Sequence, residues 1–542
     1  MIISDEAFGA LQEAVGEENA SREPAVLDTY AWQPTINDDP AKWVCRPAAV
    51  VLPGSTEEVQ EVVQACNQHG LKFKALTTGW GVYSGPTSTD VVQIDMRRMN
   101  RILEIDEKNM YALVEPYVTG AQLQAEAMKL GLNTHIIGAG PVCSPMASAT
   151  SGWGVGWDCI SMSYSARNVL GVEWVLPDGE VLYLGTPGSG EEWFCGDGPG
   201  PSLRGIMRGA SGALGGHGVF TRCAIKLFNW PGPKDLETKG LLMDAQSEVP
   251  ENMRFHMCFF PDQDSLADAV YEIGDAEIGY LATRVSPNVF LYGATPRLFR
   301  KLTQTTALRG ILSKTLKWMF LIVLVGSSAE EIEYQEAVLR KIISDYRGFS
   351  MEMSETPVIG PILPMNFLRV TAIPAIFRLG GLFTTALGRN ETWDMQLDWA
   401  DVGEEMRKER ISRGEILDDM GDNPFMALYE NNTWSHCENI YQYDTRNEKH
   451  LEKLYTIFAE SNIRAIELCQ EPLSSFDMRV RKLLSPLLGN FSYWQKQISQ
   501  KFDAQNAADT GMYCDEIDYD LSGGDPKLKA KLEKAISDKK PD

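Results

Sequence analysis

The chain has 542 residues and a formal net charge of −24, with 44% hydrophobic and 23% charged residues. Hydrophobic cores stop growing at about 250–300 residues, so this length predicts two domains. The composition excludes the disordered and membrane-spanning classes. The acidity argues against a nucleic-acid partner. It favours either simple solubility or an acidic face that docks a basic electron-transfer partner.

The ten cysteines form no CxxC pair, which predicts reduced thiols and no zinc or iron–sulfur site. The start of the chain, Met1 to Glu6, lacks the basic and apolar segments of a secretory signal. We therefore expect a cytoplasmic protein.

The N-terminal part of the chain alternates short apolar strands with helices. A helix is predicted over Asp5–Glu17, and Ser55 is the expected N-cap of a second helix whose first turn contains Glu57 and Glu58. Pro177-Asp178-Gly179 predicts a hairpin turn. Strands are expected at 48–52, 71–76, 91–95, 101–105, 111–115 and 172–182, and another helix at 119–130. This mixture predicts an α+β domain.

From about residue 236 the pattern changes. A strand is expected at 320–325 and long helices at 329–343 and 448–460, which is typical of a separate mixed α/β domain. The tail from about residue 476 is expected to be helical to Asp503, and then irregular and acidic.

Two glycine-rich stretches are candidates for cofactor binding. Residues 77–85 follow a predicted strand, and Gly79 and Gly81 let backbone N–H groups approach a phosphate. This stretch lacks the third glycine and the following helix of a Rossmann fingerprint. Residues 209–221 hold five glycines within ten residues, which favours backbone lying against a flat ligand. Either stretch alone fits a structural turn as well.

Six segments occur in order within residues 45–230: 46–53, 77–85, 95–100, 112–116, 171–179 and 209–221. Read together, they resemble the FAD-binding domain of the vanillyl-alcohol oxidase / p-cresol methylhydroxylase family. Phe502 to Asn506 also resembles that family's C-terminal segment, which returns to the flavin domain.

The resemblance implies a two-domain α+β flavoprotein. Residues 1–235 would form the FAD-binding domain of the p-cresol methylhydroxylase type, 236–475 a mixed α/β substrate or cap domain, and 476–542 a C-terminal segment returning to the FAD domain. Some members of the family bond FAD to a histidine in the first loop. Trp80 and Tyr83 stand there in this chain, so we expect non-covalent FAD.

The resemblance also implies the cofactor-binding residues. The diphosphate would be held by Thr78, Gly79, Trp80, Gly81 and Val82, with Pro116 and Thr119 near the cofactor. The flavin would be lined by Ser144, Met146, Ala147, Thr150, Ser151 and Gly152. The site would be completed by Ser211, Gly212, Gly215, Gly218 and Val219.

Hydride removal by a flavin needs a base for the substrate proton. In a strand over 434–441, alternation places His436 and Glu438 on one face and Tyr441 on the other. His436 with Glu438 is the first candidate for an oriented base, and a hydrogen-bonded core histidine is the alternative. His217 lies inside the second glycine-rich stretch and is the other candidate for this role.

No histidine-rich metal cluster of the kind expected in D-lactate and glycolate dehydrogenases is present in the sequence, and we expect no metal. Alcohols, phenols or related lipophilic compounds are therefore the predicted substrates. Their electrons would pass to oxygen or to a protein acceptor. A D-2-hydroxy-acid dehydrogenase is the alternative enzyme, and an accessory FAD subunit of an electron-transfer or membrane complex is the alternative of another class.

Residues 297–317 carry six basic residues and no acid among many apolar ones, and 367–389 hold three arginines. Such stretches at 297–320 and 367–389 fit peripheral membrane or subunit contact, or packing on the cap's own sheet. A homo-oligomer or a subunit of a larger complex is expected.

Overall fold

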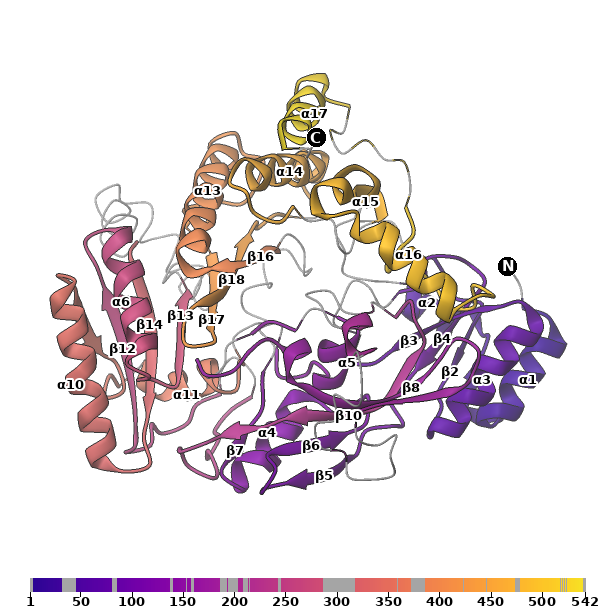
Figure 1. Ribbon diagram of the computed structural model, residues 1–542, viewed down its shortest axis with the longest axis horizontal. Coiled ribbons are helices and arrows are strands. Elements are labelled where there is room, and N and C mark those ends of the chain that lie inside the picture. The colour runs from indigo at the N-terminus through magenta and orange to yellow at the C-terminus, as the bar shows by residue number, and fades with distance from the viewer. Residues whose placement is uncertain are drawn as a thin grey trace.

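The computed structural model describes most of the chain (Figure 1). Some stretches, including 32–44, 80–84 and 286–316, lie outside the description. The described residues are 3–31, 45–79, 85–136, 140–152, 154–156, 160–185, 193, 203–207, 213, 215–241, 245–285, 317–357, 359–371, 386–422, 424–444, 446–472, 478–516, 518, 520, 522 and 524–539.

The first layer of the N-terminal domain is a four-stranded sheet in the order β1-β2-β4-β3. Strands β2, β4 and β3 run parallel, and helices α1 and α3 pack on the sheet. The Ser55 hydroxyl accepts the N–H of Glu58, so α3 begins where the sequence predicted. The elements are α1 (Asp5–Val15), β1 (Ala20–Ser21), α2 (Pro24–Ala31), β2 (Ala49–Val51), α3 (Thr56–His69), β3 (Lys72–Leu76) and β4 (Val91–Asp95).

The second layer of this domain is an antiparallel sheet in the order β5-β6-β10-β8-β9. Helices α4 and α5 pack against it around Val114, Leu123 and Trp174. The short strands β7 and β11 pair with each other. The elements are β5 (Ile102–Asp106), β6 (Tyr111–Val114), α4 (Gly120–Lys129), β7 (Leu132–Asn133), α5 (Pro145–Thr150), β8 (Val169–Val175), β9 (Val181–Leu184), β10 (Val219–Lys226) and β11 (Phe228–Asn229).

The part of the chain predicted to be the cap, and called the cap below, contains a seven-stranded antiparallel sheet in the order β15-β12-β14-β13-β17-β18-β16. Helices α6, α10 and α13 cover its outer face, on a core that includes Ile322, Leu397 and Cys437. The elements are β12 (Met253–Phe259), α6 (Gln263–Asp275), β13 (Leu281–Val285), β14 (Met319–Val325), α10 (Ala329–Asp345), β15 (Phe349–Glu352), α11 (Leu363–Phe367), β16 (Ala386–Thr392), α13 (Trp393–Ser412), β17 (Pro424–Tyr429) and β18 (Trp434–Ile440).

The inner face of this sheet packs on the N-terminal domain. One hydrophobic core contains Phe425 and Ile440 of the cap together with Met128 and Trp230 of the N-terminal domain. The segment 160–163 of the N-terminal domain is bonded to the cap, because the Ile160 N–H donates to the Tyr280 carbonyl at 2.7 Å and the Ile160 carbonyl accepts the Asn431 N–H at 2.8 Å. The inner face is thus an interface between the domains.

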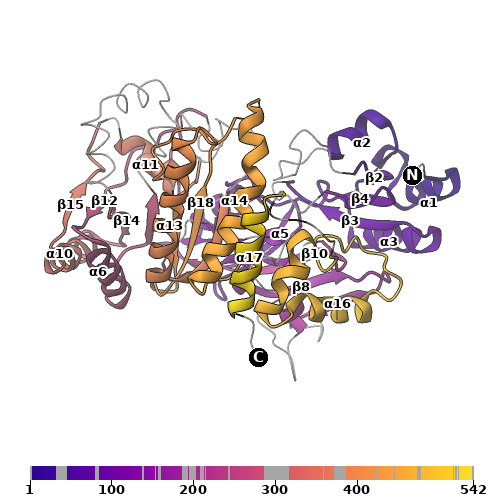
Figure 2. The same cartoon turned by 90° about the horizontal axis from the view of Figure 1, so that it is seen from above.

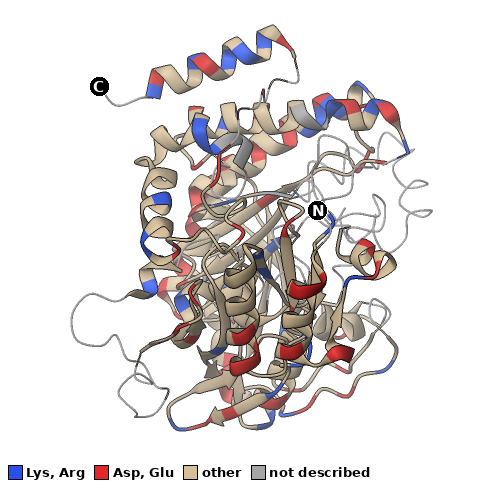
Figure 3. Ribbon diagram, turned by 90° about the vertical axis from the view of Figure 1, so that its right-hand side faces the viewer, with Lys and Arg blue, Asp and Glu red and all other residues tan. Residues whose placement is uncertain are grey.

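Four helices follow the last strand of the cap sheet: α14 (Glu448–Glu467), α15 (Met478–Leu484), α16 (Phe491–Phe502) and α17 (Pro526–Lys539). Helix α17 lies along α14 through Leu528, Leu532 and Ile536 (Figure 2). Figure 3 shows basic residues spaced along α17. The expectation of an irregular, acidic tail is therefore wrong for 526–539. The i, i+4 spacing of those three apolar residues is the helical signal that could have revealed α17.

The described helices leave no candidate for a membrane span, since none of them is both long and apolar enough.

The Tyr429 hydroxyl joins the two domains at a buried position. It donates to the Gly156 carbonyl at 2.6 Å and accepts the Gly156 N–H at 2.5 Å. We expect Tyr429→Phe to lower the free energy of unfolding by about 1–3 kcal/mol, because it leaves a buried donor and acceptor unpaired. Thermal unfolding measures this. Tyr493→Phe, at an exposed tyrosine, should leave the Tm unchanged. Equal Tm values for the two variants would show that the Tyr429 bond is not stabilising.

Candidate functional site

Three of the segments predicted to bind the cofactor converge in the N-terminal domain. The N–H of Ala213, in the second glycine-rich stretch, donates to the carbonyl of Thr150 at the end of α5 at 2.8 Å. A Cβ on Gly215 would lie 3.4 Å from the Lys74 side chain. Lys74 belongs to β3, the strand that leads into Thr78 and Gly79.

The glycines at this junction have conformations that other residues rarely adopt. The φ angles of Gly79, Gly215 and Gly218 are +72°, +68° and +105°. A Cβ on Gly218 would lie 2.3 Å from the Val175 carbonyl oxygen, so no side chain fits there. The close approach at Gly218 is to the protein's own backbone, whereas Gly79 and Gly215 are partly exposed and leave backbone that a cofactor could approach.

The other predicted cofactor residues near α4 and α5 have local structural roles. The Ser144 hydroxyl accepts the Ala147 N–H at 3.1 Å and donates to the Pro116 carbonyl at 2.5 Å. Thr119 forms a capping box with Gln122 at the start of α4. The remaining members lie on α5, just after it, or at the start of β10: Met146, Thr150, Ser151, Gly152 and Val219.

Several predicted residues lie outside the described part of the chain. These are Trp80, Gly81, Val82, Ser211 and Gly212, together with most of the basic stretch 297–320 and residues 372–385 of the second basic stretch.

His217 lies in an aromatic cluster of the N-terminal domain. Its ring stacks on Tyr513 at 5.0 Å and lies near Phe502 and Trp174 at 5.2 and 5.6 Å. The side chain is fully buried, and neither ring nitrogen has a hydrogen-bond partner among the described residues. Burial lowers the pKa of His217 to about 4. The imidazole is therefore neutral near pH 7.

His436 and Glu438 form a dyad on the inner face of the cap sheet. The Nε2 atom of His436 lies 3.0 Å from Oε1 of Glu438, and Nδ1 lies 2.7 Å from Oδ1 of Asn390. His436 is fully buried, whereas the Glu438 side chain is 19% exposed. The sequence predicted the shared face of the dyad. It missed Asn390, which lies opposite His436 on the neighbouring strand.

Asn390 determines which nitrogen of His436 can donate. An amide oxygen only accepts hydrogen bonds, so the 2.7 Å contact assigns the Nδ1 proton to a bond with Asn390. The Nε2 atom then faces the Glu438 carboxyl group, so the pair can accept a proton from a third group and hold it between Nε2 and Oε1.

Tyr441 lies away from the dyad, on the side of the sheet that packs on α13. Its hydroxyl lies 3.8 Å from the Met406 sulfur, and its ring lies 5.9 Å from the Arg407 guanidinium carbon. Cap arginines are also on that side: Arg389 lies 4.0 Å above the Trp399 ring, and Arg284 pairs with Asp422 at 3.8 Å. The structure thus joins two of the predicted catalytic residues and separates Tyr441 from them.

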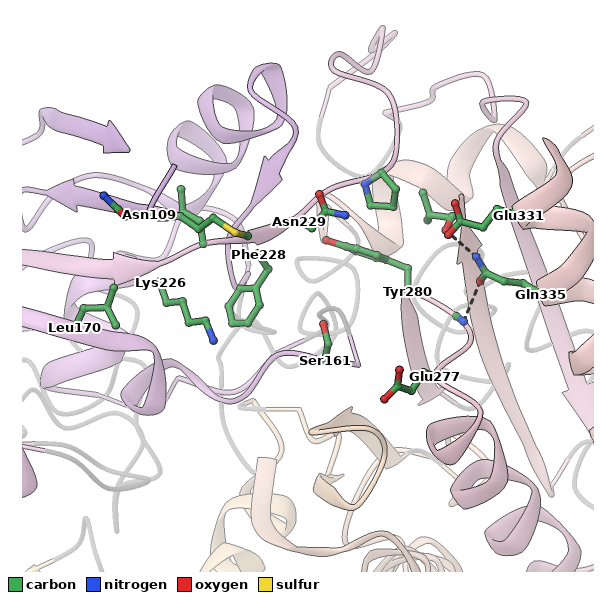
Figure 4. Close-up of a pocket in the computed structure, with 15 residues that line it drawn as sticks. Asn109, Ser161, Leu170, Lys226, Phe228, Asn229, Glu277, Tyr280, Glu331 and Gln335 are labelled. Atoms are coloured by element: carbon green, nitrogen blue, oxygen red, sulfur yellow. Dashed lines mark hydrogen bonds between the residues drawn. The ribbon is translucent and has the colours of Figure 1, made fainter. Parts of the chain in front are cut away.

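A cleft of about 670 Å³ lies elsewhere between the two domains (Figure 4). Lys226 and Phe228 line one side of it, and Tyr280 and Gln335 line the other. The Gln335 amide already accepts the Gly279 N–H at 3.0 Å and donates to the Val325 carbonyl at 3.1 Å. The lining includes none of the predicted site residues, so this cleft is separate from the dyad. Across the described residues, no group of three or more potential metal ligands is found.

Comparison with known proteins identifies the class of the N-terminal domain. Residues 47–185 match the family model of the FAD binding domain. The chain therefore carries an FAD-binding domain, and FAD is its cofactor.

The whole fold is similar to that of a solved flavoprotein. The crystal structure of p-cresol methylhydroxylase with substrate bound superposes with a TM-score of 0.73, covering 95% of this chain and 98% of that chain at 17% identity. The chain thus has the fold of the p-cresol methylhydroxylase type, as the sequence predicted.

Curated relatives cover less of the chain. The flavoprotein subunit of 4-cresol dehydrogenase (hydroxylating) of Pseudomonas putida is 28% identical over 38% of this chain and 39% of its own length. A probable mitochondrial D-lactate dehydrogenase of Danio rerio is 24% identical over 54% of this chain and 55% of its own length. The chain thus matches less than two thirds of these relatives.

The buried neutral histidine predicts a dependence of stability on pH. Between pH 6.5 and 4 the unfolded chain binds a proton at His217 that the folded chain excludes, so stability falls as the pH falls through this window. Across this window the lowered pKa corresponds to a loss of about 3 kcal/mol in the free energy of unfolding. We expect His217→Phe, which keeps a ring in the cluster, to show a smaller loss of Tm than the native protein between pH 7 and pH 5.

His69→Gln is the control for this measurement, because His69 is a partly exposed histidine at the end of α3. This variant should retain the native pH dependence. If His217→Phe also retained it, the titration of His217 would not contribute to the acid sensitivity.

Proposed function

We propose that this protein is an FAD-dependent oxidoreductase that oxidises an alcohol, a phenol or a related lipophilic compound. The observation that carries the proposal is the position of the His436–Glu438 dyad on the cap face that packs against the FAD-binding domain. The resemblance of the sequence to the vanillyl-alcohol oxidase type and the p-cresol methylhydroxylase fold support it. FAD would be held non-covalently by the three convergent segments described above.

Glu438 is the group that would meet the substrate. It is the more exposed member of the dyad, and His436 behind it is fixed by Asn390 at 2.7 Å. A substrate hydroxyl that donates to Glu438 would pass its proton to the carboxylate–imidazole pair as the C–H bond breaks. FAD, when bound, supplies the hydride acceptor. His436 is then a positioning residue that keeps Glu438 ready to accept a proton.

The charge of the inner face favours a neutral substrate. A carboxylate substrate needs an arginine or lysine partner. In the described part of the cap sheet, Arg284 and Arg389 both lie on the outer face. The neighbours of the dyad on the inner face are Phe425, Ile440 and Asn390. Such a surface suits an aromatic or aliphatic alcohol better than a 2-hydroxy acid.

One observation favours a second candidate, a D-2-hydroxy-acid dehydrogenase. The D-lactate dehydrogenase relative matches 54% of this chain, including more than the FAD-binding domain. An accessory FAD subunit that transfers electrons within a complex is the third candidate. In both candidate enzymes, reduced FAD would be reoxidised by oxygen or by a protein acceptor.

Anaerobic bleaching of the flavin distinguishes these functions. We expect 4-alkylphenols or benzylic alcohols to bleach the bound flavin, and D-lactate and glycolate to leave it oxidised. Glu438→Gln should slow bleaching by about 10²–10⁴-fold, because a positioned base contributes this much. Stopped-flow absorbance with the same substrates measures the rates, and acid precipitation tests whether the flavin is released.

A second histidine–glutamate pair in the cap provides a matched control. His256 lies 3.1 Å from Glu336, and this pair joins β12 to α10 on the outer face of the sheet. Glu336→Gln should leave the bleaching rate unchanged. Equal rates for Glu438→Gln and Glu336→Gln would contradict the assigned base. Bleaching by D-lactate would establish the second candidate, and no bleaching by any substrate would favour the accessory subunit.

A further inference from the structure

The C-terminal segment 503–515 runs between parts of the FAD-binding domain. Its residues 507–509 extend the first sheet, because the Phe73 N–H donates to the Ala507 carbonyl at 2.9 Å and the Asp509 N–H donates to the Phe73 carbonyl at 3.0 Å. The Asp503 carboxylate accepts the N–H groups of Ala507 and Ala508 at 2.7 and 2.9 Å. The segment thus forms an additional edge of the sheet beside β3.

Asp509 connects this segment to residues on both sides of the predicted phosphate loop. Its carboxylate accepts the backbone N–H of Thr87 at 2.8 Å and also the Thr87 hydroxyl. It lies 3.7 Å from the Lys74 ammonium. Lys74 precedes the predicted loop residues Thr78 and Gly79, and Thr87 follows the loop. One buried carboxylate therefore contacts both flanks.

The ion pair of Lys74 and Asp509 is shielded from solvent. Their side chains are 0% and 1% exposed. The Lys74 ammonium has no hydrogen-bond partner among the described residues. Burial lowers the pKa of Lys74, and the charge of Asp509 opposes that shift. A buried ion pair of this kind often contributes less stability than apolar residues of the same size. Stability alone is therefore a poor reason for its presence here.

The same segment also supports the second glycine-rich stretch. A Cβ on Gly216 would lie 2.4 Å from the Cβ of Tyr513 and 3.4 Å from the carbonyl oxygen of Asp509. The ring of Tyr513 stacks on His217. The buried guanidinium of Arg481 holds this part of the segment by donating to the Gly511 and Asp515 carbonyls at 3.0 and 2.8 Å. Residues 509–513 therefore contact the flanks of the first glycine-rich stretch and also the second stretch.

We propose that Asp509 is a positioning residue for FAD, which acts by fixing the flanks of the phosphate loop through Lys74 and Thr87. Docking of the segment 503–515 and binding of FAD then stabilise each other. By linkage, the factor by which docking raises the affinity for FAD equals the factor by which FAD favours docking. The inference rests on the FAD-binding domain and on the proposed non-covalent attachment, and it is independent of the substrate.

Affinity for FAD tests the proposal directly. Apoprotein is prepared by acid ammonium sulfate, and FAD is titrated back while its fluorescence quenching is followed. We expect Asp509→Asn, which keeps the size and removes the charge, to raise the Kd for FAD at least about ten-fold, or about 1.4 kcal/mol. The milder Thr87→Val, which removes one hydrogen bond to Asp509, should raise the Kd in the same direction and covers the case in which Asp509→Asn does not fold.

Thr283→Val is the matched control. The Thr283 hydroxyl is also buried and donates to the Met426 carbonyl at 2.5 Å, but it lies in the cap. This variant should lower the Tm of the apoprotein and leave the Kd for FAD unchanged. If Thr87→Val and Asp509→Asn lowered the Tm but kept the native Kd for FAD, the proposal would be overturned. Asp509 would then have only a structural role. An equal rise of Kd in Thr283→Val would overturn it as well.

Limited proteolysis gives a second readout. FAD should protect residues 503–515 from cleavage in the native protein and protect them less in Asp509→Asn. Equal cleavage with and without FAD in the native protein would show that the segment and the cofactor are not coupled. Acid precipitation tests the proposed non-covalent attachment separately, because a covalently bound flavin would stay with the precipitated protein.

Discussion

The structure depends on the need to bury the inner face of the cap sheet. Strands such as β14 are buried along their whole length, and the outer face is covered by α6, α10 and α13. On the inner face, Phe367 of α11 packs in the same core as Phe425, and Met128 and Trp230 of the FAD-binding domain complete that core. A sheet that is apolar on both faces needs a layer on each side. Apolar burial therefore sets the orientation of the two domains.

This orientation explains where polar side chains occur in the cap. A polar group on the inner face loses water, so it must find a partner in the protein. His436 finds Asn390 and Glu438 there, whereas Arg389 is placed on the outer face against Trp399. The described inner-face neighbours of the dyad, Phe425, Ile440 and Asn390, are uncharged. This local environment supports the proposed removal of a proton from a neutral donor.

Local patterns in the sequence predicted much of the fold. The Ser55 cap, the β2-α3-β3 unit and the shared face of His436 and Glu438 each follow from neighbours within a few residues. The partners that complete the site could not be predicted in this way. Asn390 reaches His436 across 46 positions, and Asp509 reaches Thr87 across 422. Side-chain periodicity contains no information about contacts at such separations, because they are set by the packing of whole elements.

The contact of Asp509 also has a physical reason within the sheet. The C-terminal segment meets β3 in one parallel bridge, between Phe73 and Ala508. So short a pairing specifies its register weakly, and a slip of one residue would turn every side chain to the opposite face. The Asp503 carboxylate shapes the segment itself by accepting the Ala507 N–H, and the Asp509 carboxylate fixes the segment's position by accepting the Thr87 N–H. A charged acceptor is thus used where apolar contacts would tolerate a shift, and the register that Asp509 imposes is the one in which Tyr513 lies against the glycine-rich stretch.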